Sequence, residues 1–544
     1  MAVARAGLRL ARTRVVAASA VALVTATACG SGGGTAGPSA TGTAAQPDLT
    51  AILRYQGVVG PSQDPIRPQQ SCEPLTLRVI FDSLFDFDST GKLVPSLATG
   101  YEVRPTNVLR LTLRQGVSFQ DGTPFNADAV AFNLNRVLTD PASTIKATLA
   151  DLQSTTVVDQ NTIDLQMKRA AVGRILPSLA DRAGMMASPT AVKAAGSSAE
   201  FAKAPVGAGM YKVTGTIVSR QSMSVRRWDG YWDKTGQLLG GIDFSEIPFS
   251  SLVNAIQAKD VDWVSPQTVA DGNSLKSNSA IKLLTGPGSQ FRLLIMNETL
   301  APFTDPRVRQ AISYAIDREA LAKALTQGTV HATFQEFPPT SAAYDPNLDK
   351  NPPFPHDPAK ARALLQQAGV AGTISFDAYV GASATSFVQM GELIAAQLQQ
   401  VGITMNVKTI DIAQAFPTVF LSGPTKHGTA QAASYGGVAT ADPDQQLHDH
   451  FLSDGSVNAG GNEAPGLRPL LEEAEGTADP AARAALYRQA NGLVVQQVQD
   501  GVPIFFDPAI TATQNYVGGV NRAYQYCDSR FRGVFISKGK TPVA

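Results

Sequence analysis

The sequence predicts a mixed α/β fold made of more than one compact unit. No repeat of fixed period is visible along the chain. Strand-like alternation of apolar and polar residues and amphipathic helices with clear end signals both occur throughout. The length of 544 residues is also enough for several domains of ordinary size.

Four segments carry the strand signal. Apolar and polar residues alternate at 108–114 and again at 162–167, which predicts half-buried strands. The segment QFRLLIMN (290–297) is more continuously apolar and predicts a strand covered on both faces. Residues 211–227 are interpreted as two strands with a connection between them.

The helices are recognised by their ends. In DPAKARALLQQAG (357–369), Asp357 is placed to cap the helix, proline follows at the first helical position, and a glycine stands at the stop. The segment 304–328 repeats this device from Asp305, and Asp317 is placed to restart the helix as a second cap. The amphipathic helices predicted in this way span 304–328, 357–369, 391–402 and 479–501.

Composition excludes some classes of function. Lys plus Arg and Asp plus Glu are both 45, so the formal net charge is zero and nothing steers the chain toward nucleic acid or an anionic surface. Hydrophobic residues make up 44% of the chain, and no run after residue 24 approaches membrane-spanning length. We therefore expect a globular body.

The N-terminus predicts an export signal over residues 1–28. Four arginines lie among the first 14 residues and precede the uncharged apolar run VVAASAVALV (15–24). This ten-residue run is too short to cross a hydrocarbon core of about 30 Å, and the pattern is typical of a secretory signal. Arg12 and Arg14 are not adjacent, so the general export route is favoured over the twin-arginine route.

Cys29 directly follows the small residues Ala26, Thr27 and Ala28, and this junction resembles a bacterial lipoprotein signal in which the cysteine sulfur is acylated. The departure is Ala26, where that pattern usually has leucine. The segment 29–47 is rich in Gly, Ser, Thr and Ala and predicts a flexible tether. A cleaved signal without lipid is the alternative.

Six segments, in this order, resemble the large solute-binding lipoproteins of bacterial ABC importers for peptides and nickel, the extracellular solute-binding proteins of family 5. They are 91–103, 113–138, PVGAGMYKV (205–213), 302–321, 357–369 and ADPD (441–444). No single segment is decisive, but together they cover about residues 50–530. The resemblance implies capture of a ligand by closure of two lobes about hinge strands, with no chemistry performed on it.

The resemblance also implies the architecture, a two-lobed periplasmic-binding-protein-like fold (class II, large) with a third, smaller inserted domain and a ligand cleft between the main lobes. Lobe I is expected to comprise 48–85, 205–297 and 500–544, the inserted domain II 86–204, and lobe III 298–499. Residues 290–297 are the candidate crossing strand. This division places Cys72 and Cys527 in one lobe, where a disulfide is possible outside the cytoplasm.

In peptide-binding relatives, a segment with a tryptophan and an aspartate lies in the cleft, and the aspartate binds the α-amine of the peptide. Aligning that segment with SYGGVATADPDQQ (434–446) places Gly436 at the tryptophan and Ala439 at the amine-binding position. Alanine cannot pair with a cation, and an unpaired charge in a dry cleft costs several kcal/mol. The segment 380–389, read as a loop, has no Lys or Arg where dipeptide-binding relatives hold the carboxylate.

Two interpretations stay open. In the first, Asp442 or Asp444 binds an amine, and Arg292 or Lys426 binds a carboxylate. In the second, the ligand is a longer peptide held by its backbone, or a peptide-like or neutral solute. In the second case Tyr435, followed by two glycines, could stack on the ligand. The candidate cleft residues are therefore Tyr435, Gly436, Gly437, Ala439, Asp442, Asp444 and Arg292.

His448 and His450 suggest a metal site, but they are spaced i and i+2, and such positions do not face each other on a helix. We expect two histidines on a solvated helix and no metal site. A second motif set, Ser143 to Lys146, Lys234 to Gly236 and Ser453 to Gly455, resembles the motifs of penicillin-recognising enzymes in the wrong order. We expect no enzyme.

The sequence thus predicts a monomeric binding protein, held to the membrane only by its lipid, that delivers oligopeptides or peptide-like solutes to an ABC permease. It predicts no cofactor and no nucleic-acid partner. The alternatives are a non-peptide ligand in the same fold (a metal chelate, a haem-like or a sugar-like solute) and, below that, a serine acyl-transfer enzyme.

Overall fold

In the computed structural model of the chain, the described residues are 45–67, 74–88, 91–370, 374–382, 385–411, 419, 428–440, 442–520 and 530–543. The chain divides into residues 1–44 and a body of residues 45–544, and the body is described below. The predicted signal peptide, nearly all of the predicted tether, and Cys29, Cys72, Cys527 and Lys426 lie outside the described residues.

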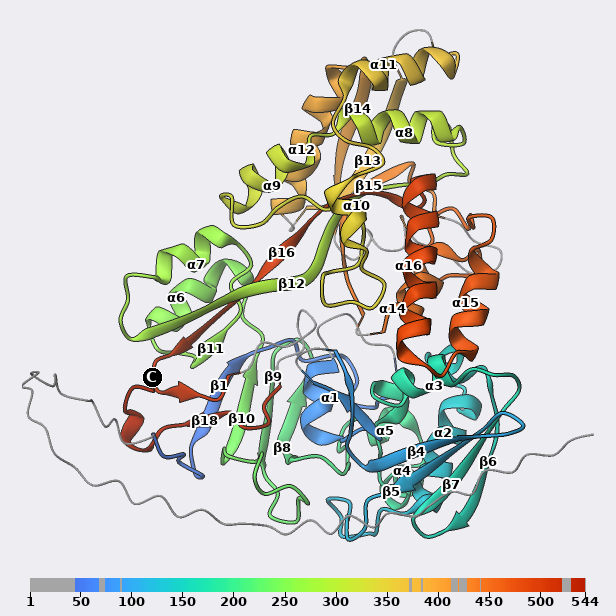
Figure 1. The fold of residues 1–544 in the computed structure, drawn as a ribbon. Helices are drawn as coiled ribbons and strands as arrows, with labels where there is room; N and C mark the ends of the chain where they lie inside the picture. Colours follow the sequence, from blue (N-terminus) through green and yellow to red (C-terminus); the bar gives the residue numbers. More distant parts are fainter. Residues whose placement is uncertain are drawn as a thin grey trace, which may run out of the picture. The chain divides into compact units, whose positions relative to one another are not determined.

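One large sheet runs through the body (Figure 1). Its strands in spatial order are β14 (Ile403–Ile410), β13 (Ile374–Gly381), β15 (Ala432–Val438), β12 (Ile281–Met296), β16 (Gly501–Gln514), β11 (Trp263–Val264), β1 (Ile52–Gln56), β10 (Gly241–Ser245), β9 (Ser222–Arg227) and β8 (Tyr211–Val218). The pairs β13–β14, β13–β15, β1–β10 and β1–β11 are parallel, and the other pairs are antiparallel.

Two long strands cross from one half of this sheet to the other. β12 and β16 pair with each other over most of their length, while β12 pairs with β15 at one end and β16 pairs with β11 at the other. The β12–β16 register shifts between Pro287 and Phe291, opposite Pro508 and Phe506. The predicted crossing strand at 290–297 is therefore confirmed as the second half of β12.

A smaller antiparallel sheet lies outside the large one. It consists of β4 (Ala98–Arg104), β5 (Val108–Leu113), β7 (Thr162–Met167) and β6 (Leu152–Asp159). Its apolar faces pack with α2 (Ala127–Thr139) and α3 (Val172–Ser178) in a separate core that includes Leu111, Leu134 and Ile175. Two short pairs, β2 (Phe85–Phe87) with β3 (Leu93–Pro95) and β17 (Val517–Gly518) with β18 (Phe535–Ile536), complete the strands among the described residues.

The remaining helices pack along the large sheet or in the cores beside it. They are α1 (Pro74–Ile80), α4 (Pro189–Ala195), α5 (Ser198–Phe201), α6 (Leu252–Gln257), α7 (Val269–Leu275), α8 (Pro306–Ala315), α9 (Arg318–Thr326), α10 (Pro346–Lys350), α11 (Pro358–Gln367), α12 (Thr385–Gln399), α14 (Pro443–Phe451), α15 (Leu467–Gly476) and α16 (Pro480–Gln497). Short 3₁₀ turns lie at Lys146–Leu149, Arg182–Gly184, Phe249–Ser251 and Lys538–Lys540.

The predicted helix caps are confirmed. The side chains of Asp305, Asp317 and Asp357 each accept a backbone N–H in the first turn of α8, α9 and α11, so the segment 304–328 does contain two helices. Satisfying one otherwise unpaired N–H in this way stabilises a helix by about 1 kcal/mol.

Two predicted boundaries are wrong. The helix expected over 479–501 ends at Gln497 because Val498 adopts a left-handed backbone (φ 48°), and Gly501 already begins β16. The loop expected over 380–389 is short, because β13 extends to Gly381 and α12 begins at Thr385. The first turn of α12 thus brings Ser386 and Phe387 toward the crossing strands.

The separate cores follow the division of the sheet. One core joins α8, α9, α11 and α12 to β13 and β14, and a neighbouring core joins α14, α15 and α16. At the other end, β1, β8, β9 and β10 enclose a core with Tyr55, Trp263 and Phe531. The body is thus a two-lobed α/β fold with a smaller third unit around β4–β7.

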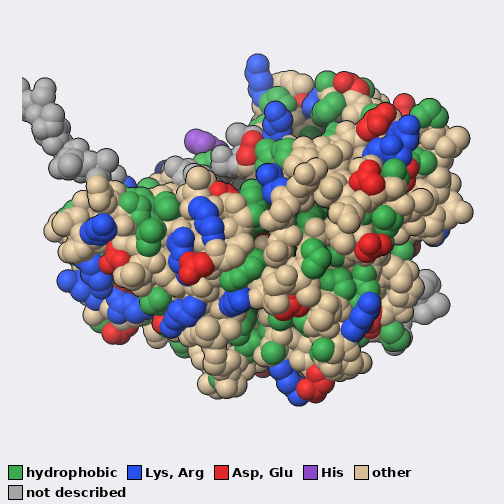
Figure 2. Space-filling model, turned by 90° about the horizontal axis from the view of Figure 1, so that it is seen from below, with side chains coloured by type: hydrophobic (Ala, Val, Ile, Leu, Met, Phe, Trp, Pro, Cys, Tyr) green, Lys and Arg blue, Asp and Glu red, His purple; other side chains and the backbone are tan. Residues whose placement is uncertain are grey.

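The surface carries both signs of charge. On the face drawn in Figure 2, Lys and Arg side chains are interspersed with Asp and Glu side chains, as the equal totals of 45 and 45 lead one to expect. Among the described residues, no helix combines the length and apolar character needed to cross a membrane.

Candidate functional site

The predicted cleft residues of β15 lie on two different faces of the sheet. β15 runs antiparallel to β12 with Tyr435 opposite Leu293, Gly436 opposite Arg292 and Gly437 opposite Phe291. Because successive side chains in a strand point to opposite faces, Gly436 shares a face with Arg292, while Tyr435 and Gly437 belong to the other face.

Arg292 is already engaged by groups of the protein. Its Nε donates to Asp507 Oδ2 at 2.7 Å, its Nη1 donates to Ser386 Oγ at 3.2 Å, and its guanidinium lies 3.7 Å from the centre of the Phe387 ring. Burial raises the pKa of Asp507, and Arg292 partly offsets that effect. A Cβ at Gly436 would lie 2.7 Å from the Phe387 ring, so glycine here makes room for that ring.

The other face of β15 is closed by packing. Tyr435 is half-buried against a cluster that contains Phe291, Leu293 and Ala439. Burial and the carboxylates of Asp500 and Glu336 raise the pKa of Tyr435 to about 12. Ala439 is 1% exposed and its N–H donates to the carbonyl of Ser289 at 2.8 Å. The residue at the expected amine-binding position is therefore a buried methyl group.

Asp442 and Asp444 lie where β15 gives way to α14. Asp442 caps the helix by accepting the N–H of Asp444 at 2.9 Å, with Pro443 at the first helical position. Both residues line a cavity of about 230 Å³. Of the predicted residues, the structure thus brings these two together and places Arg292 and Tyr435 elsewhere.

Three arginines from distant parts of the chain also line this cavity. Arg78, Arg182 and Arg530 all line it. Arg78 pairs with Asp181 at 3.1 Å, Arg530 pairs with Asp86 at 2.5 Å, and Arg182 donates to the carbonyl of Pro65 at 3.0 Å. The cavity is therefore lined by carboxylates of α14, which we call the carboxylate wall, and by these three guanidinium groups, which we call the guanidinium wall.

Burial and neighbouring charges raise the pKa values of the carboxylates in this wall. Burial raises the pKa of Asp442, which Arg483 offsets in part. Burial, Glu475 and Asp442 together raise the pKa of Asp444 well above its usual value, while its Oδ1 accepts a hydrogen bond from the Tyr487 hydroxyl at 3.2 Å. Three carboxylates close together favour protonation or a nearby cation.

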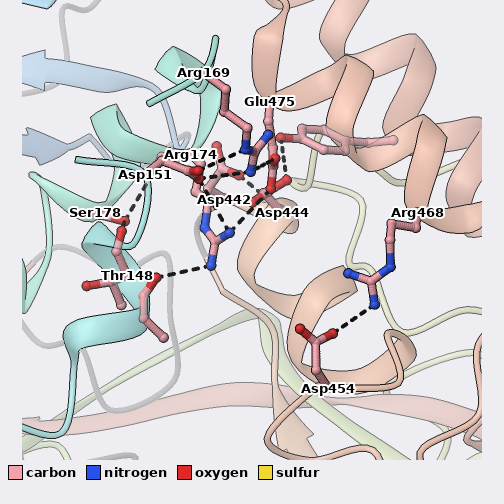
Figure 3. A network of polar contacts seen from close by, with 12 residues as sticks. Thr148, Asp151, Arg169, Arg174, Ser178, Asp442, Asp444, Asp454, Arg468 and Glu475 are labelled. Atoms are coloured by element: carbon pink, nitrogen blue, oxygen red, sulfur yellow. Dashed lines mark hydrogen bonds and ion pairs between the residues drawn. The ribbon is translucent and has the colours of Figure 1, made fainter. Parts of the chain in front are cut away.

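Arginines join this wall to the inserted sheet (Figure 3). Arg169 contacts Glu475 at 2.5 Å and Asp151 at 2.8 Å, and Arg174 lies 3.6 Å from Glu475. From the other side, Arg483 lies 3.5 Å from Asp442 and donates to the carbonyl of Gly173 at 3.1 Å. We call Arg169, Arg174, Arg483, Asp442 and Glu475 the arginine bridge.

The expectation of two solvated histidines on α14 is wrong. His448 lines the cavity, where burial and Arg174 lower its pKa. His450 Nδ1 lies 3.1 Å from Glu336 Oε2 and 3.5 Å from Asp500 Oδ2. Burial opposes a charged imidazole, but Asp500 and Glu336 outweigh it and raise the pKa of His450 to about 10.

A second cavity, of about 700 Å³, lies beside the crossing strands. It is lined by β12 around Gly286, by β16 at Phe506, Pro508 and Ile510, and by the segment after α9 at Val330. Its lining is mostly small and apolar, in contrast to the charged walls of the first cavity.

The residues of the enzyme-like motifs have local partners or are enclosed. Ser453 Oγ donates to Glu463 Oε2 at 3.1 Å, and the Lys234 ammonium donates to the carbonyl of Asp229. Ser143 is 9% exposed, and its hydroxyl has no hydrogen-bond partner among the described residues.

The sequence interpretation missed Glu475, Glu336, Asp500 and the bridging arginines. Their contacts join segments hundreds of positions apart, which one sequence does not reveal. One signal was available for Glu475: it continues the buried stripe of α15 after Leu467 and Leu471 at a spacing of four residues. An acidic residue on a buried stripe predicts a paired or functional carboxylate.

Two lobes joined by a pair of crossing strands, with a charged cavity in the body, define a protein of the periplasmic-binding type. The family model for bacterial extracellular solute-binding proteins, family 5, matches residues 92–458. The chain belongs to this family, whose members serve as the solute-binding proteins of ABC importers.

Individual relatives cover most of the chain. The glutathione-binding protein GsiB of Escherichia coli (strain K12) is 28% identical over 464 residues, covering 84% of this chain and 89% of that protein. The structure of DppA from Helicobacter pylori in complex with peptide STSA has a TM-score of 0.77 at 21% identity and covers 90% of this chain and 98% of that chain. The structure of AgaA from A. tumefacien R10 in complex with agropinic acid has a TM-score of 0.77 at 22% identity, covering 90% and 99%.

Proposed function

We propose that this chain is an exported, lipid-anchored binding protein that captures oligopeptides or peptide-like solutes and delivers them to an ABC permease. It acts as a monomer and leaves its ligand chemically unchanged. The signal-like N-terminus and Cys29 support export and anchoring, and membership of the solute-binding family supports the role in import. GsiB is named a glutathione-binding protein, and the DppA structure contains the peptide STSA.

The proposed lobes follow the sequence division. Lobe I comprises 48–85, 205–297 and 500–544, the inserted domain II comprises 86–204, and lobe III comprises 298–499. The separate cores around β4–β7, around β13–β14 and around β1 support this division. The two long strands between the main lobes then act as the hinge about which they close.

The observation that carries the proposal is that carboxylates and guanidinium groups line the same cavity of about 230 Å³. We assign the ammonium group of the ligand to Asp442 and Asp444 and its carboxylate to the wall of Arg78, Arg182 and Arg530. A ligand ammonium beside Asp444 supplies the cation that this buried carboxylate cluster favours. The other predicted cleft residues then have a structural role and do not bind the charged ends of the ligand. They are Tyr435, Gly436, Gly437, Ala439 and Arg292.

The first test is to identify any ligand that co-purifies with the protein. Native mass spectrometry of freshly purified protein should show a bound peptide-sized molecule that is lost on mild denaturation. A molecule without an ionisable amine and carboxylate would contradict the assignment of the two walls.

Asp444→Asn isolates the proposed ammonium site because asparagine keeps the shape and removes the charge. We expect affinity for a free-amine tripeptide to fall by about 10–100-fold, the cost of losing a hydrogen bond to a charged group. Asp229→Asn, at a surface carboxylate that is 91% exposed, is the matched control and should leave affinity unchanged. Calorimetric titration measures both variants, and equal affinities would exclude Asp444 as the ammonium site.

A less polar ligand is the second candidate, favoured by the larger, mostly apolar cavity beside the crossing strands. Phe506→Ala would then weaken binding of the co-purified ligand while Asp444→Asn would not. The reverse pattern supports the charged cavity.

Lipid anchoring and the disulfide have direct tests. Cys29→Ser should move the protein from the membrane fraction to the medium, whereas an unchanged distribution would exclude the anchor. Alkylation of the intact protein before and after reduction measures whether Cys72 and Cys527 are paired.

A further inference from the structure

Glu336, His450 and Asp500 form a cluster of three metal-ligating side chains where lobe III meets the first residue of the last lobe I segment. They come from the segment between α9 and α10, from the last turn of α14, and from the residue that precedes β16. One ligand atom from each lies within 4.8 Å of the other two. None of these residues takes part in the proposed ligand cavity.

The spacing of the three ligand atoms suits a metal ion. His450 Nδ1 is 3.1 Å from Glu336 Oε2 and 3.5 Å from Asp500 Oδ2. Nitrogen and oxygen ligands that lie about 2.0–2.2 Å from a tetrahedral metal ion are about 3.3–3.5 Å from one another. The two distances are close to this separation, and the third pair of ligand atoms lies within 4.8 Å.

The carboxylates of the cluster are enclosed, and their contacts with the His450 imidazole are ion pairs without hydrogen-bond geometry. Glu336 is 3% exposed and Asp500 is 4% exposed. Glu336 Oε2, both carboxylate oxygens of Asp500 and His450 Nδ1 have no hydrogen-bond partner among the described residues. Buried carboxylate oxygens are normally satisfied, so each such atom calls for a physical explanation.

Charge balance also favours a divalent cation. The nearest further groups form their own pair, with Arg309 3.3 Å from Glu298, whose Oε1 accepts the N–H of Asp500 at 3.0 Å. With an imidazolium at His450, two ionised carboxylates leave the cluster with one uncompensated negative charge. A neutral imidazole, two carboxylates and a divalent ion sum to zero, which avoids the cost of a buried net charge.

The geometry points to a binding site for a first-row divalent transition-metal ion, with Glu336, His450 and Asp500 as its protein ligands. One imidazole and two carboxylates suit Zn²⁺, Ni²⁺ or Mn²⁺ better than a thiolate-preferring ion. The ion ties α14 and the segment after α9 to the start of a crossing strand, so it stabilises the lobe at the base of the hinge. Three protein ligands leave a further coordination position for water.

The test uses tag-free, chelator-treated full-length protein and Zn²⁺ as the probe. Titration against a chromogenic chelator should show one tightly bound Zn²⁺ per chain, and the thermal midpoint should rise as bound metal stabilises the folded state. Substitution of Co²⁺ should give the visible absorption of a low-symmetry site with nitrogen and oxygen ligands. Absence of a stoichiometric site in the unmodified protein would overturn the proposal.

Variants separate this site from adventitious binding. His450→Ala should weaken Zn²⁺ binding by more than about 100-fold, beyond the roughly 10–100-fold cost of losing an outer-shell partner. His448→Ala, two positions earlier on α14, and His331→Ala, at an exposed histidine 3.0 Å from Glu319, should keep the site. Loss of binding only in His331→Ala would show adventitious surface binding and overturn the proposal.

Glu336→Gln is a second test of the site that remains informative if His450→Ala fails to fold. The amide keeps the volume of the side chain and removes one anionic ligand, so Zn²⁺ affinity should fall while the circular dichroism spectrum stays unchanged. Retained affinity in this variant would overturn the assignment of Glu336. The measurement does not depend on the transported solute, so it can fail without affecting the proposed function.

Discussion

Two buried acidic clusters around α14 differ in the cation that neutralises them. Asp442, Asp444 and Glu475 face arginines of both the inserted domain and α16, whereas Glu336 and Asp500 face the single imidazole of His450. A guanidinium is always charged and forms fixed, directional contacts. An imidazole can be charged, neutral or a metal ligand.

The type of cation determines the role that each cluster can have. The arginine bridge joins two units of the chain, so it holds them together while their surfaces are in contact. The histidine cluster joins α14 and the segment before α10 to the start of β16, and its charge can be balanced by a proton or by a metal ion. Matched carboxylate-to-amide substitutions in the two clusters test this comparison.

The largest expected effect is at the arginine bridge. Glu475→Gln leaves Arg169 and Arg174 with one carboxylate fewer at a site where Glu475 is only 3% exposed. Breaking a buried ion pair costs about 3–5 kcal/mol, and because Arg169 is 39% exposed we expect a loss of about 2–4 kcal/mol in the free energy of unfolding. Urea unfolding measures it. A loss under about 1 kcal/mol would mean that the bridge is no stronger than a surface pair.

An intermediate effect is expected in the pH dependence of ligand binding. The pKa of Asp444 is raised well above 3.8 by burial and by its carboxylate neighbours. A protonated carboxyl group does not attract an ammonium ion, so affinity for a free-amine peptide should fall as the pH drops through this raised pKa, before an ordinary aspartate would be protonated.

The control for this pH effect is Asp444→Asn. Its affinity for the same peptide should be lower but nearly independent of pH in the same range. Calorimetric titration at several pH values compares the two proteins. Parallel curves would show that another group is responsible for the dependence.

The smallest expected effect is at the histidine cluster in metal-free protein. Glu336→Gln leaves the His450 imidazolium paired with Asp500 and removes the uncompensated charge, so the free energy of unfolding should change by less than about 1 kcal/mol. The same variant in the presence of Zn²⁺ should lack the stabilisation that the unmodified protein gains. A loss as large as that of Glu475→Gln would remove the distinction between the two clusters.

Local features of the fold could be predicted from sequence because their causes are local. The capping aspartates Asp305, Asp317 and Asp357 act on N–H groups two or three residues away, and the strand at 290–297 carries its burial in its own apolar residues. The end of α16 was missed because a left-handed Val498, not a glycine or proline, stops the helix.

The candidate site was less accessible to sequence reasoning. Asp442 and Asp444 were found because they follow β15 in a segment that resembles the family. Glu475 and the bridging arginines meet only through packing of distant segments, and Asp500 meets His450 only because β16 returns beside β12. A residue such as Tyr435 looks suited to ligand stacking in sequence, yet its face of the sheet is filled by Phe291 and Leu293.

The paired crossing strands have a mechanical consequence. A single connecting segment can twist freely, but two hydrogen-bonded strands form a ribbon that resists torsion and sideways slip. Pro287 and Pro508 pair with each other at one end of the stretch where the β12–β16 register shifts, so the ribbon is weakest there. The lobes are therefore limited to bending about this ribbon. Solutes of different size would be distinguished by the bend angle at which the lobes close on them.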